Sequence, residues 1–212
     1  MSFFSNFQSD KCPGSISGNP LSGLTEKICV SAKKVFDACI KQMQRDNVSL
    51  TLTNLIPENP TYPLSFISAK SVSAKGAVNN LNVEHITDKP CNARVKCDVA
   101  IPMEVLFVDA KGVEGKGFAH LNVPMDVVLF VPQPSIMPFC VEATCSCVAP
   151  EGRFEGERVV INCCFSVILK VIMDVDILIP AYGYCQMPPC QEFNQEVCAG
   201  FFELPLYPKG NK

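Results

Sequence analysis

Residues 139–181 have the sequence F-C-V-E-A-T-C-S-C-V-A-P-E-G-R-F-E-G-E-R-V-V-I-N-C-C-F-S-V-I-L-K-V-I-M-D-V-D-I-L-I-P-A, and this stretch decides the fold. Two segments of alternating or continuous apolar residues, 139–148 and 158–179, flank a linker that contains Pro150, Gly152 and Gly156. Extended apolar segments separated by proline and glycine are typical of a β-hairpin. We therefore predict a long hairpin here.

The cysteines of this hairpin lie on both faces of the predicted sheet. Cys145 and Cys147 share a face, whereas the adjacent Cys163 and Cys164 point to opposite faces, because side chains alternate along a strand. With the turn centred near Phe154, the first two cysteines lie opposite residues 161–164. These four cysteines are candidates for internal disulfides, and we expect Cys145 to pair with Cys163 or Cys164.

The composition favours a large hydrophobic core and argues against nucleic acid as a partner. Hydrophobic residues make up 48% of the 212 residues and charged residues only 18%. This balance exceeds the globular norm for apolar residues and falls below it for charged ones. The net charge of -3 provides no basic face for nucleic acid, so we expect no nucleic-acid partner.

The most apolar segment, 159–180, does not have the pattern of a membrane helix. It contains Asn162, Lys170, Asp174 and Asp176, and a membrane helix needs about 20 predominantly apolar residues. Its β-branched residues favour a strand, and we expect no membrane insertion. The N-terminus lacks a basic region followed by an apolar core, so we expect no secretory signal peptide.

Residues 25–45 have the spacing of an amphipathic helix. Thr25 is a candidate cap, and six apolar residues recur at steps of three and four: Ile28, Ala32, Val35, Phe36, Cys39 and Met43. The β region follows, over residues 48–186. We therefore predict a mainly β (α+β) fold, with antiparallel β-sandwich-like sheets, one N-terminal helix and extended terminal segments.

Two further hairpins are expected in the β region. Residues 64–74 and 77–86 flank Lys75-Gly76, and residues 94–109 and 118–132 flank a glycine-rich stretch. The glycine-rich stretch is not a phosphate-binding loop, because a strand pattern follows it in place of the required helix.

We expect a single domain over residues 25–198, with residues 1–24 as a flexible N-terminal arm and residues 199–212 as a C-terminal tail. Residues 1–24 show no periodicity, which is typical of a disordered tail. They nevertheless carry Phe3, Phe4, Phe7 and Cys12, and extended segments of this kind also dock on a neighbour's sheet edge. Both interpretations of the arm stay open.

The thirteen cysteines admit three chemistries. The spacings in the cysteine-rich stretch are C-x-C, C-C, C-x4-C and C-x7-C, of which only C-x4-C falls in the C-x2-4-C range of structural zinc sites. Both histidines lie far from this stretch in the sequence. Cys29, Cys39 and Cys97 are candidates for buried free thiols. An odd number of cysteines leaves at least one to pair between chains or to stay free. The candidates for inter-subunit disulfides lie near prolines, turns or tails: Cys12, Cys140, Cys185, Cys190 and Cys198.

No set of residues points to catalysis. A nucleophilic cysteine needs a neighbouring general base, and the chain has only two histidines and no catalytic signature around any cysteine. His120, in the alternating segment that begins at Phe118, fits a strand better than a general base. Asp174 and Asp176 share one face of a strand, which is more typical of a solvated stripe than of a catalytic pair across a cleft. We predict a protein that is not an enzyme and has no catalytic residues, no cofactor and no resident metal.

The β region resembles a known family. Arg94-Val-Lys-Cys-Asp-Val, the segment 103–109, the glycine turn and the segment 120–132 together resemble the SPOCS-type repeat of spore-coat and spore-envelope proteins of Firmicutes. The resemblance covers about residues 90–180. The cysteine- and proline-rich C-terminus is similar to that of cross-linked exosporium and appendage proteins of clostridia and bacilli.

This resemblance implies a structural protein that self-assembles into a disulfide-cross-linked layer or filament on the spore surface. Such a protein is made in the mother-cell cytoplasm without a signal peptide and is exposed when that cell lyses, so its thiols oxidise after assembly. The implied partners are further copies of the chain and other spore-envelope proteins. The alternative is a non-enzymatic zinc- or carbohydrate-binding β module that acts as an envelope scaffold adaptor.

Overall fold

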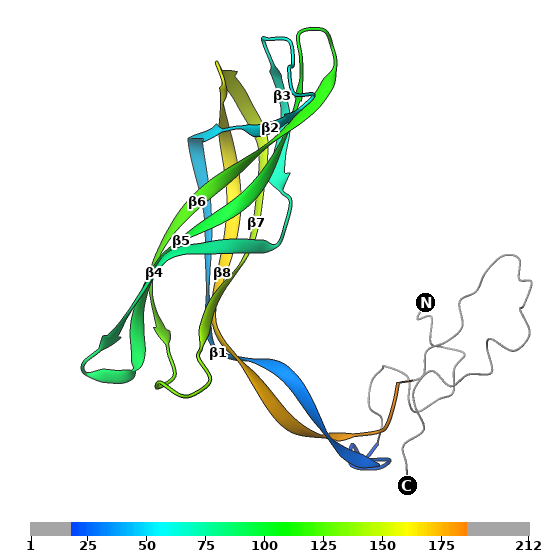
Figure 1. Cartoon of the computed structure of the whole chain (residues 1–212), viewed down its shortest axis with the longest axis vertical. Coiled ribbons are helices and arrows are strands. Elements are labelled where there is room, and N and C mark those ends of the chain that lie inside the picture. Colours follow the sequence, from blue (N-terminus) through cyan, green and yellow to red (C-terminus); the bar gives the residue numbers. More distant parts are fainter. Residues whose placement is uncertain (1–17, 186–212) are drawn as a thin grey trace, which may run out of the picture. The chain divides into compact units, whose positions relative to one another are not determined.

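The computed structural model describes residues 18–185, which form two compact units (Figure 1). The larger unit consists of Ala32–Val175, and the smaller one contains residues 18–31 and 176–185. The eight strands are β1 (Glu26–Thr51), β2 (Thr53–Ile56), β3 (Ser65–Ser71), β4 (Lys75–Ile86), β5 (Lys89–Val108), β6 (Glu114–Phe130), β7 (Cys140–Glu155) and β8 (Arg158–Ala181).

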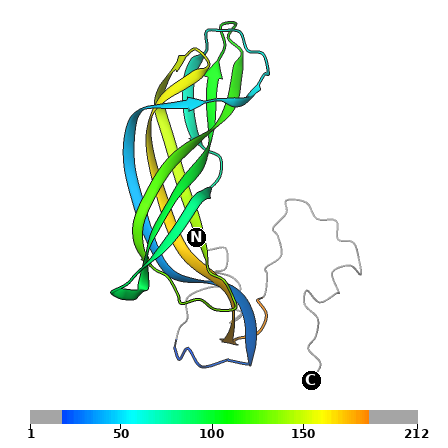
Figure 2. The ribbon, with the colours of Figure 1, turned by 60° about the vertical axis from the view of Figure 1, so that its left-hand side comes forward.

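All eight strands belong to one sheet with the order β1-β8-β7-β3-β5-β6-β2, and β4 pairs with β5 and β7. The prediction of a mainly β, antiparallel protein is confirmed. A sandwich would contain two sheets, whereas here a single sheet surrounds the core. β1 and β2 are consecutive in the chain yet stand at the two ends of the strand order, so the sheet curves back toward its beginning (Figure 2).

The core of the larger unit follows from the two-residue period of its strands. Every second side chain of β5 to β8 points inward, because successive residues on a strand face opposite sides. The fully buried side chains with the largest volumes include Phe107, Ile101, Met103, Leu121, Leu129, Ile161 and Leu169. All of these except Phe107 join the other inward residues in one cluster, against which part of β1 packs through Phe36 and Cys39.

The helix predicted over residues 25–45 is wrong, because this segment belongs to strand β1. Ile28, Ala32 and Phe36 are spaced by four residues, a step that keeps side chains on one face of a strand as well as of a helix. Ile28 and Val30 are half-buried while Cys29 is exposed, which is the alternation of a strand. Phe36 and Cys39 both pack against the core, and the three-residue step between them completes the helix-like spacing.

Charged side chains of β1 reach across to β6, which lies next to the other end of the strand order. β1 and β6 are not neighbours in the sheet. The Lys41 ammonium nevertheless donates to the carbonyl of Pro124 at 2.8 Å, and the Phe130 amide donates to the Asp37 carboxylate at 2.8 Å. These side chains satisfy backbone groups of β6 that would otherwise need a partner strand.

The hairpin predicted around Lys75-Gly76 is wrong. β3 and β4 do not pair with each other but follow one another along the same edge of β5, where Ser71 lies opposite Met103 and Ala77 opposite Ala100. Gly76 is buried inside the sheet, and a Cβ there would lie 2.8 Å from the Val99 side chain. This glycine therefore permits close packing and does not form a turn.

The predicted hairpin around the glycine-rich stretch is confirmed by the pairing of β5 with β6. Its turn is organised by Asp109, whose carboxylate accepts hydrogen bonds from the amides of Val113, Lys111 and Thr61 at 2.8, 2.8 and 3.2 Å. These amides, the Val113 amide first, hold the pKa of Asp109 below its usual value. The ionised carboxylate is thus part of the turn.

The β7–β8 hairpin is also confirmed, but its turn lies farther along the chain than predicted. Glu155 lies opposite Arg158, so the turn consists of Gly156 and Glu157, and Gly156 has a φ of 65°. The linker residues Pro150 and Gly152 remain within β7, where the register shifts between Val148 and Glu151. They form an irregularity in the strand and not its end.

The smaller unit is a ribbon built from the ends of β1 and β8 and the segments beside them. The Thr25 amide donates to the carbonyl of Ala181 at 3.0 Å. The Tyr182 hydroxyl donates to the carbonyl of Pro20, and the Tyr182 ring lies against Gly23, whose φ is 87°. These contacts hold the two segments together.

We predict that Ile101→Ala lowers the free energy of unfolding by about 2–5 kcal/mol, because it leaves a cavity in a packed core. The Ile101 side chain is fully buried. The measurement is urea denaturation of the variant and the wild type. Ile67→Ala, at an exposed position of β3, is the matched control and is expected to change stability by less than about 0.5 kcal/mol. Equal losses at both positions would contradict the assigned core.

A second prediction concerns acid stability. The folded pKa of Asp109 is depressed, so its contribution is present above the ordinary carboxyl pKa of about 4 and is lost as the pH falls through the folded value. Asp109→Asn should therefore lose less stability than the wild type between about pH 4 and pH 2. The measurement is the urea midpoint at each pH. Asp88→Asn, in the exposed turn before β5, is the control and should keep the wild-type profile.

Candidate functional site

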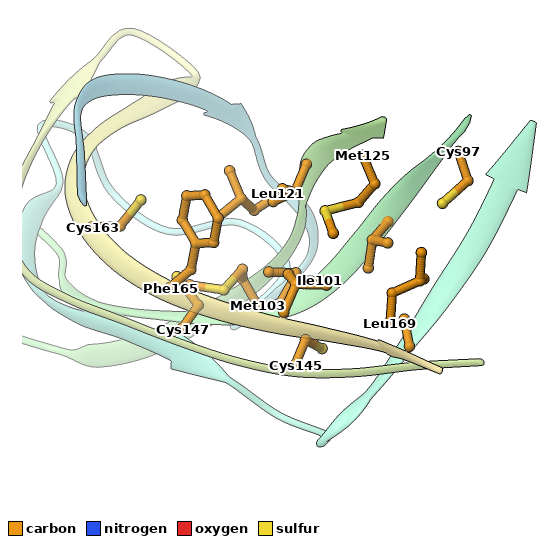
Figure 3. Close-up of a cluster of buried hydrophobic side chains, with 14 of the residues drawn as sticks. Cys97, Ile101, Met103, Leu121, Met125, Cys145, Cys147, Cys163, Phe165 and Leu169 are labelled. Carbon is orange, nitrogen blue, oxygen red and sulfur yellow. The ribbon is translucent and has the colours of Figure 1, made fainter. Parts of the chain in front are cut away.

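The cysteines of β5, β7 and β8 are the chemically distinctive groups of the larger unit, and most of them point inward. Cys97, Cys145, Cys147 and Cys163 are buried, and Figure 3 shows them among the apolar core side chains. The exposed fractions of Cys147 and Cys163 are 1% each. Cys164, the next residue, is exposed. The prediction that Cys163 and Cys164 face opposite sides is confirmed, as is the shared face of Cys145 and Cys147.

The register does not bring together the internal pair that the sequence suggested. Cys145 lies opposite Val167 and Cys147 opposite Phe165, because the turn lies at residues 156–157 and not at Phe154. The closer pair is Cys147 and Cys163, whose thiols share a hydrogen bond. Cys164 points away from the core, so it is placed for contacts outside its own hairpin.

Burial makes the inward thiols poor nucleophiles. It raises the pKa of Cys147 to about 12, with a smaller contribution from the neighbouring Cys163. Burial also raises the pKa of Cys97 and of Cys145. Since the thiolate is the reactive form, these side chains are suited to packing in the folded chain and not to thiol chemistry. The expected role of Cys97 as a buried thiol is confirmed.

Other thiols are accessible on the surface. Cys140 begins β7 and is exposed, as is Cys185 in the smaller unit, and both were predicted as inter-subunit candidates. Cys29 was expected to be buried but is exposed, because it lies on the face of β1 opposite Ile28 and Val30. Cys39 is half-buried.

Cys91 is an exposed thiol that the sequence reasoning missed. It lies near the beginning of β5, where its carbonyl accepts a hydrogen bond from the Val131 amide at 3.0 Å. The signal was present in the sequence, since Cys91 follows the polar turn residues Thr87 and Asp88 and precedes the first core residue of β5. The candidates Cys12, Cys190 and Cys198 and the arm residues Phe3, Phe4 and Phe7 lie outside the described residues.

One open depression borders the exposed Cys164. Its volume is about 440 Å³. It is lined by Gln42, Met43, Gln44, Ser146, Cys164, Phe165 and Ser166. The polar members are amides and hydroxyls, which can donate and accept hydrogen bonds. Across residues 18–185, no group of three or more His, Cys, Asp or Glu side chains is gathered as a metal site. Both histidines are exposed, His85 on β4 and His120 on β6.

No protein-family model, curated protein or solved structure matches this chain. Within the described part of the chain, no helix has the length and hydrophobicity needed to cross a bilayer.

We predict two classes of thiol reactivity in the native chain. Cys29, Cys91, Cys140 and Cys164 should react with iodoacetamide in the folded state, whereas Cys97, Cys145, Cys147 and Cys163 should react only after denaturation. The measurement is peptide mass spectrometry of freshly reduced protein, labelled with one isotope before and another after addition of guanidinium. Fast native labelling of Cys147 would contradict the assigned interior.

Proposed function

We propose that this chain is a structural subunit that self-assembles into a layer or filament and is then cross-linked between chains by disulfides. One observation carries the proposal. The thiols divide into a buried set within the core and an exposed set on both units. Only the exposed set is positioned for a second chain to reach.

The chemistry of cross-linking follows from this division. Two exposed thiols from different chains lose two electrons and two protons to a low-molecular-weight disulfide, which is reduced to two thiols. The buried thiols do not compete, because their high pKa values suppress the thiolate. Oxidation of assembled chains would therefore join neighbours without disturbing the core.

The smaller unit supplies an apolar surface for association. A ribbon of two strand segments is marginally stable in water by itself. This one exposes several large side chains, which include Leu21, Ile177, Leu178 and Tyr184. Burial of such side chains against another chain stabilises the contact by removing apolar surface from water. The ribbon is thus suited to contacts within a polymer.

The place of the polymer is proposed from the resemblance to SPOCS-type spore-envelope proteins. We propose assembly on the spore surface, with further copies of this chain and other envelope proteins as partners. Residues 1–24 with Phe3, Phe4 and Phe7 would act as an arm that docks on a neighbour. The thiols of Cys12, Cys190 and Cys198 would add cross-links to those of Cys140 and Cys185.

The test is electrophoresis of the native material boiled in SDS, with and without reductant, together with electron microscopy of the same sample. We expect high-mass ladders that collapse to one band near 23.2 kDa on reduction, and ordered sheets or fibres in the images. A monomer band in both lanes without ordered assembly would contradict the proposal. Stoichiometric zinc in that soluble protein would then support the binding-module alternative.

We further predict the outcome of removing the accessible thiols together. The variant replaces by serine the exposed cysteines and those outside the described residues: Cys12, Cys29, Cys91, Cys140, Cys164, Cys185, Cys190 and Cys198. Its ladder without reductant should disappear, because the remaining thiols are buried or half-buried. Cys97→Ala alone is the control and should keep the ladder. Persistence of the ladder in the multiple variant would mean that the half-buried Cys39 or the buried thiols form the cross-links, which would contradict the proposed division.

A further inference from the structure

Strands β1 and β6 lie side by side where the sheet of the larger unit curves back, but they do not pair (Figure 2). Within residues 18–185, the outer edge of β6 pairs with one strand, β2, and that short pairing ends at Phe118. Beyond it, side chains of β1 reach backbone groups of β6 in place of a ladder. We name this contact the seam (residues 37–45 of β1 and 122–130 of β6).

Three hydrogen bonds from side chains to backbone hold the seam together. Two of them, described above, join Asp37 to the Phe130 amide and Lys41 to the Pro124 carbonyl, each at 2.8 Å. A regular pair of strands about 4.8 Å apart would bond through backbone groups alone. The seam is thus a weaker connection than any ladder of the same length.

Arg45 makes the third bond and also covers part of the core. Its Nη1 donates to the carbonyl of Asn122 at 3.4 Å. Its guanidinium lies over the ring of the buried Phe165, 5.2 Å from the ring centroid. The side chain therefore closes the seam on its outer side and contacts the interior behind it.

Pro124 prevents the seam from closing as a regular ladder. Its carbonyl points to β1, so its backbone nitrogen faces the same side, and proline has no amide hydrogen to donate there. Within sheets, proline is found mainly on edge strands for this reason. The amides of Asp126 and Val128 lie on the same edge, because alternate residues of a strand direct their backbone groups to the same side.

The rest of the sheet does not depend on the seam. β6 pairs with β5 along its whole length, and β1 stays beside β8 in the strand order. Separation of β1 from β6 breaks the three side-chain bonds and the stacking of the Phe36 and Phe130 rings, whose centroids are 6.3 Å apart. It breaks no ladder. Regions held by few backbone hydrogen bonds open locally at a lower free energy than global unfolding requires.

Two thiols lie behind the seam. Cys39 belongs to the seam segment of β1, is half-buried and packs against the core. Cys97 is buried on β5 opposite Met125 of β6, and Figure 3 shows these two side chains in the core. Burial, the neighbouring Asp98 and then Cys39 raise the pKa of Cys97, so the two thiols are close enough to interact. Opening of the seam therefore exposes both.

Cys145 lies on a different wall of the core. Its thiol contacts the carbonyl of Ser73 at 3.9 Å, and a Cβ on Gly76 would lie 3.3 Å from its sulfur. In the strand order, β8 separates its strand β7 from β1, and β3 and β5 separate it from β6. Cys145 therefore stays covered when β1 and β6 separate.

We infer that the seam is the place where the larger unit opens in its native state, and that the closed seam shields Cys39 and Cys97 from thiol reagents and disulfides. Lys41 and Arg45 keep it closed. The inference goes beyond the proposed cross-linking, because it concerns a single folded chain and holds whether or not that chain polymerises. A closed seam keeps two thiols of the core out of disulfide exchange.

The test follows iodoacetamide labelling of the reduced full chain over time, by peptide mass spectrometry without denaturant, and compares the wild type with Lys41→Ala/Arg45→Ala. Cys39 should react at least about fivefold faster in the variant, the factor expected for losing two net hydrogen bonds at the low end of their usual strength. Cys97 should become reactive, and Cys145 should stay unreactive. Removal of two positive charges would by itself disfavour nearby thiolates, so faster labelling reports opening.

Lys116→Ala is the matched control, because Lys116 lies on β6 but pairs with Glu104 of β5 at 3.2 Å, outside the seam. It should leave the labelling of all three cysteines unchanged. Equal acceleration of Cys39, Cys97 and Cys145 in the double variant would overturn the inference, because it would reveal a loss of global stability. Unchanged labelling of Cys39 and Cys97 would overturn it as well.

A second measurement, hydrogen exchange of the reduced wild type resolved to single amides by NMR, needs no variant. The amides of Asp126 and Val128, which face the seam, should exchange fast, whereas those of Met125 and Val127, which face β5, should be protected. Equal protection of both pairs would overturn the inference, because it would require a strand partner at the seam. Neither measurement depends on polymer formation, so their outcomes are separate from that of the proposed function.

Discussion

The structure depends on the alternation of side chains along a few long strands that enclose one core. Along the central parts of β5 to β8 buried residues mostly alternate with more exposed ones, so a change of one position in the sequence usually moves a side chain from the interior toward the surface. Cys163 and Cys164 illustrate the consequence, because neighbours in the chain have opposite environments. This constraint separates the thiols into those that pack the core and those that another chain can reach.

Much of this division could be predicted from the sequence, because it needs only the period of a strand. The β7–β8 hairpin and the faces of Cys145, Cys147, Cys163 and Cys164 were predicted on that basis and confirmed. The register was not, because residues 150–152 resemble a turn but form an irregularity inside β7. A short-range pattern does not distinguish these two uses of proline and glycine.

Two other features of the fold could not be predicted from local sequence patterns, because they depend on contacts between residues far apart in the chain. The spacing of Ile28, Ala32 and Phe36 suits a helix and a strand equally, and only the position of β1 beside β8 resolves the choice. The succession of β3 and β4 along one edge of β5 likewise depends on partners distant in the sequence.

The most direct measurement is disulfide mapping of polymers assembled from equal amounts of ¹⁴N- and ¹⁵N-labelled chains and oxidised after assembly. We expect disulfide-linked peptides of mixed isotopic label that contain exposed cysteines such as Cys140, with Cys97 and Cys145 recovered as free thiols. Disulfides found only within single chains would contradict a cross-linked structural subunit. So would inter-chain bonds through Cys97 or Cys145, because the folded core would then have to open during assembly.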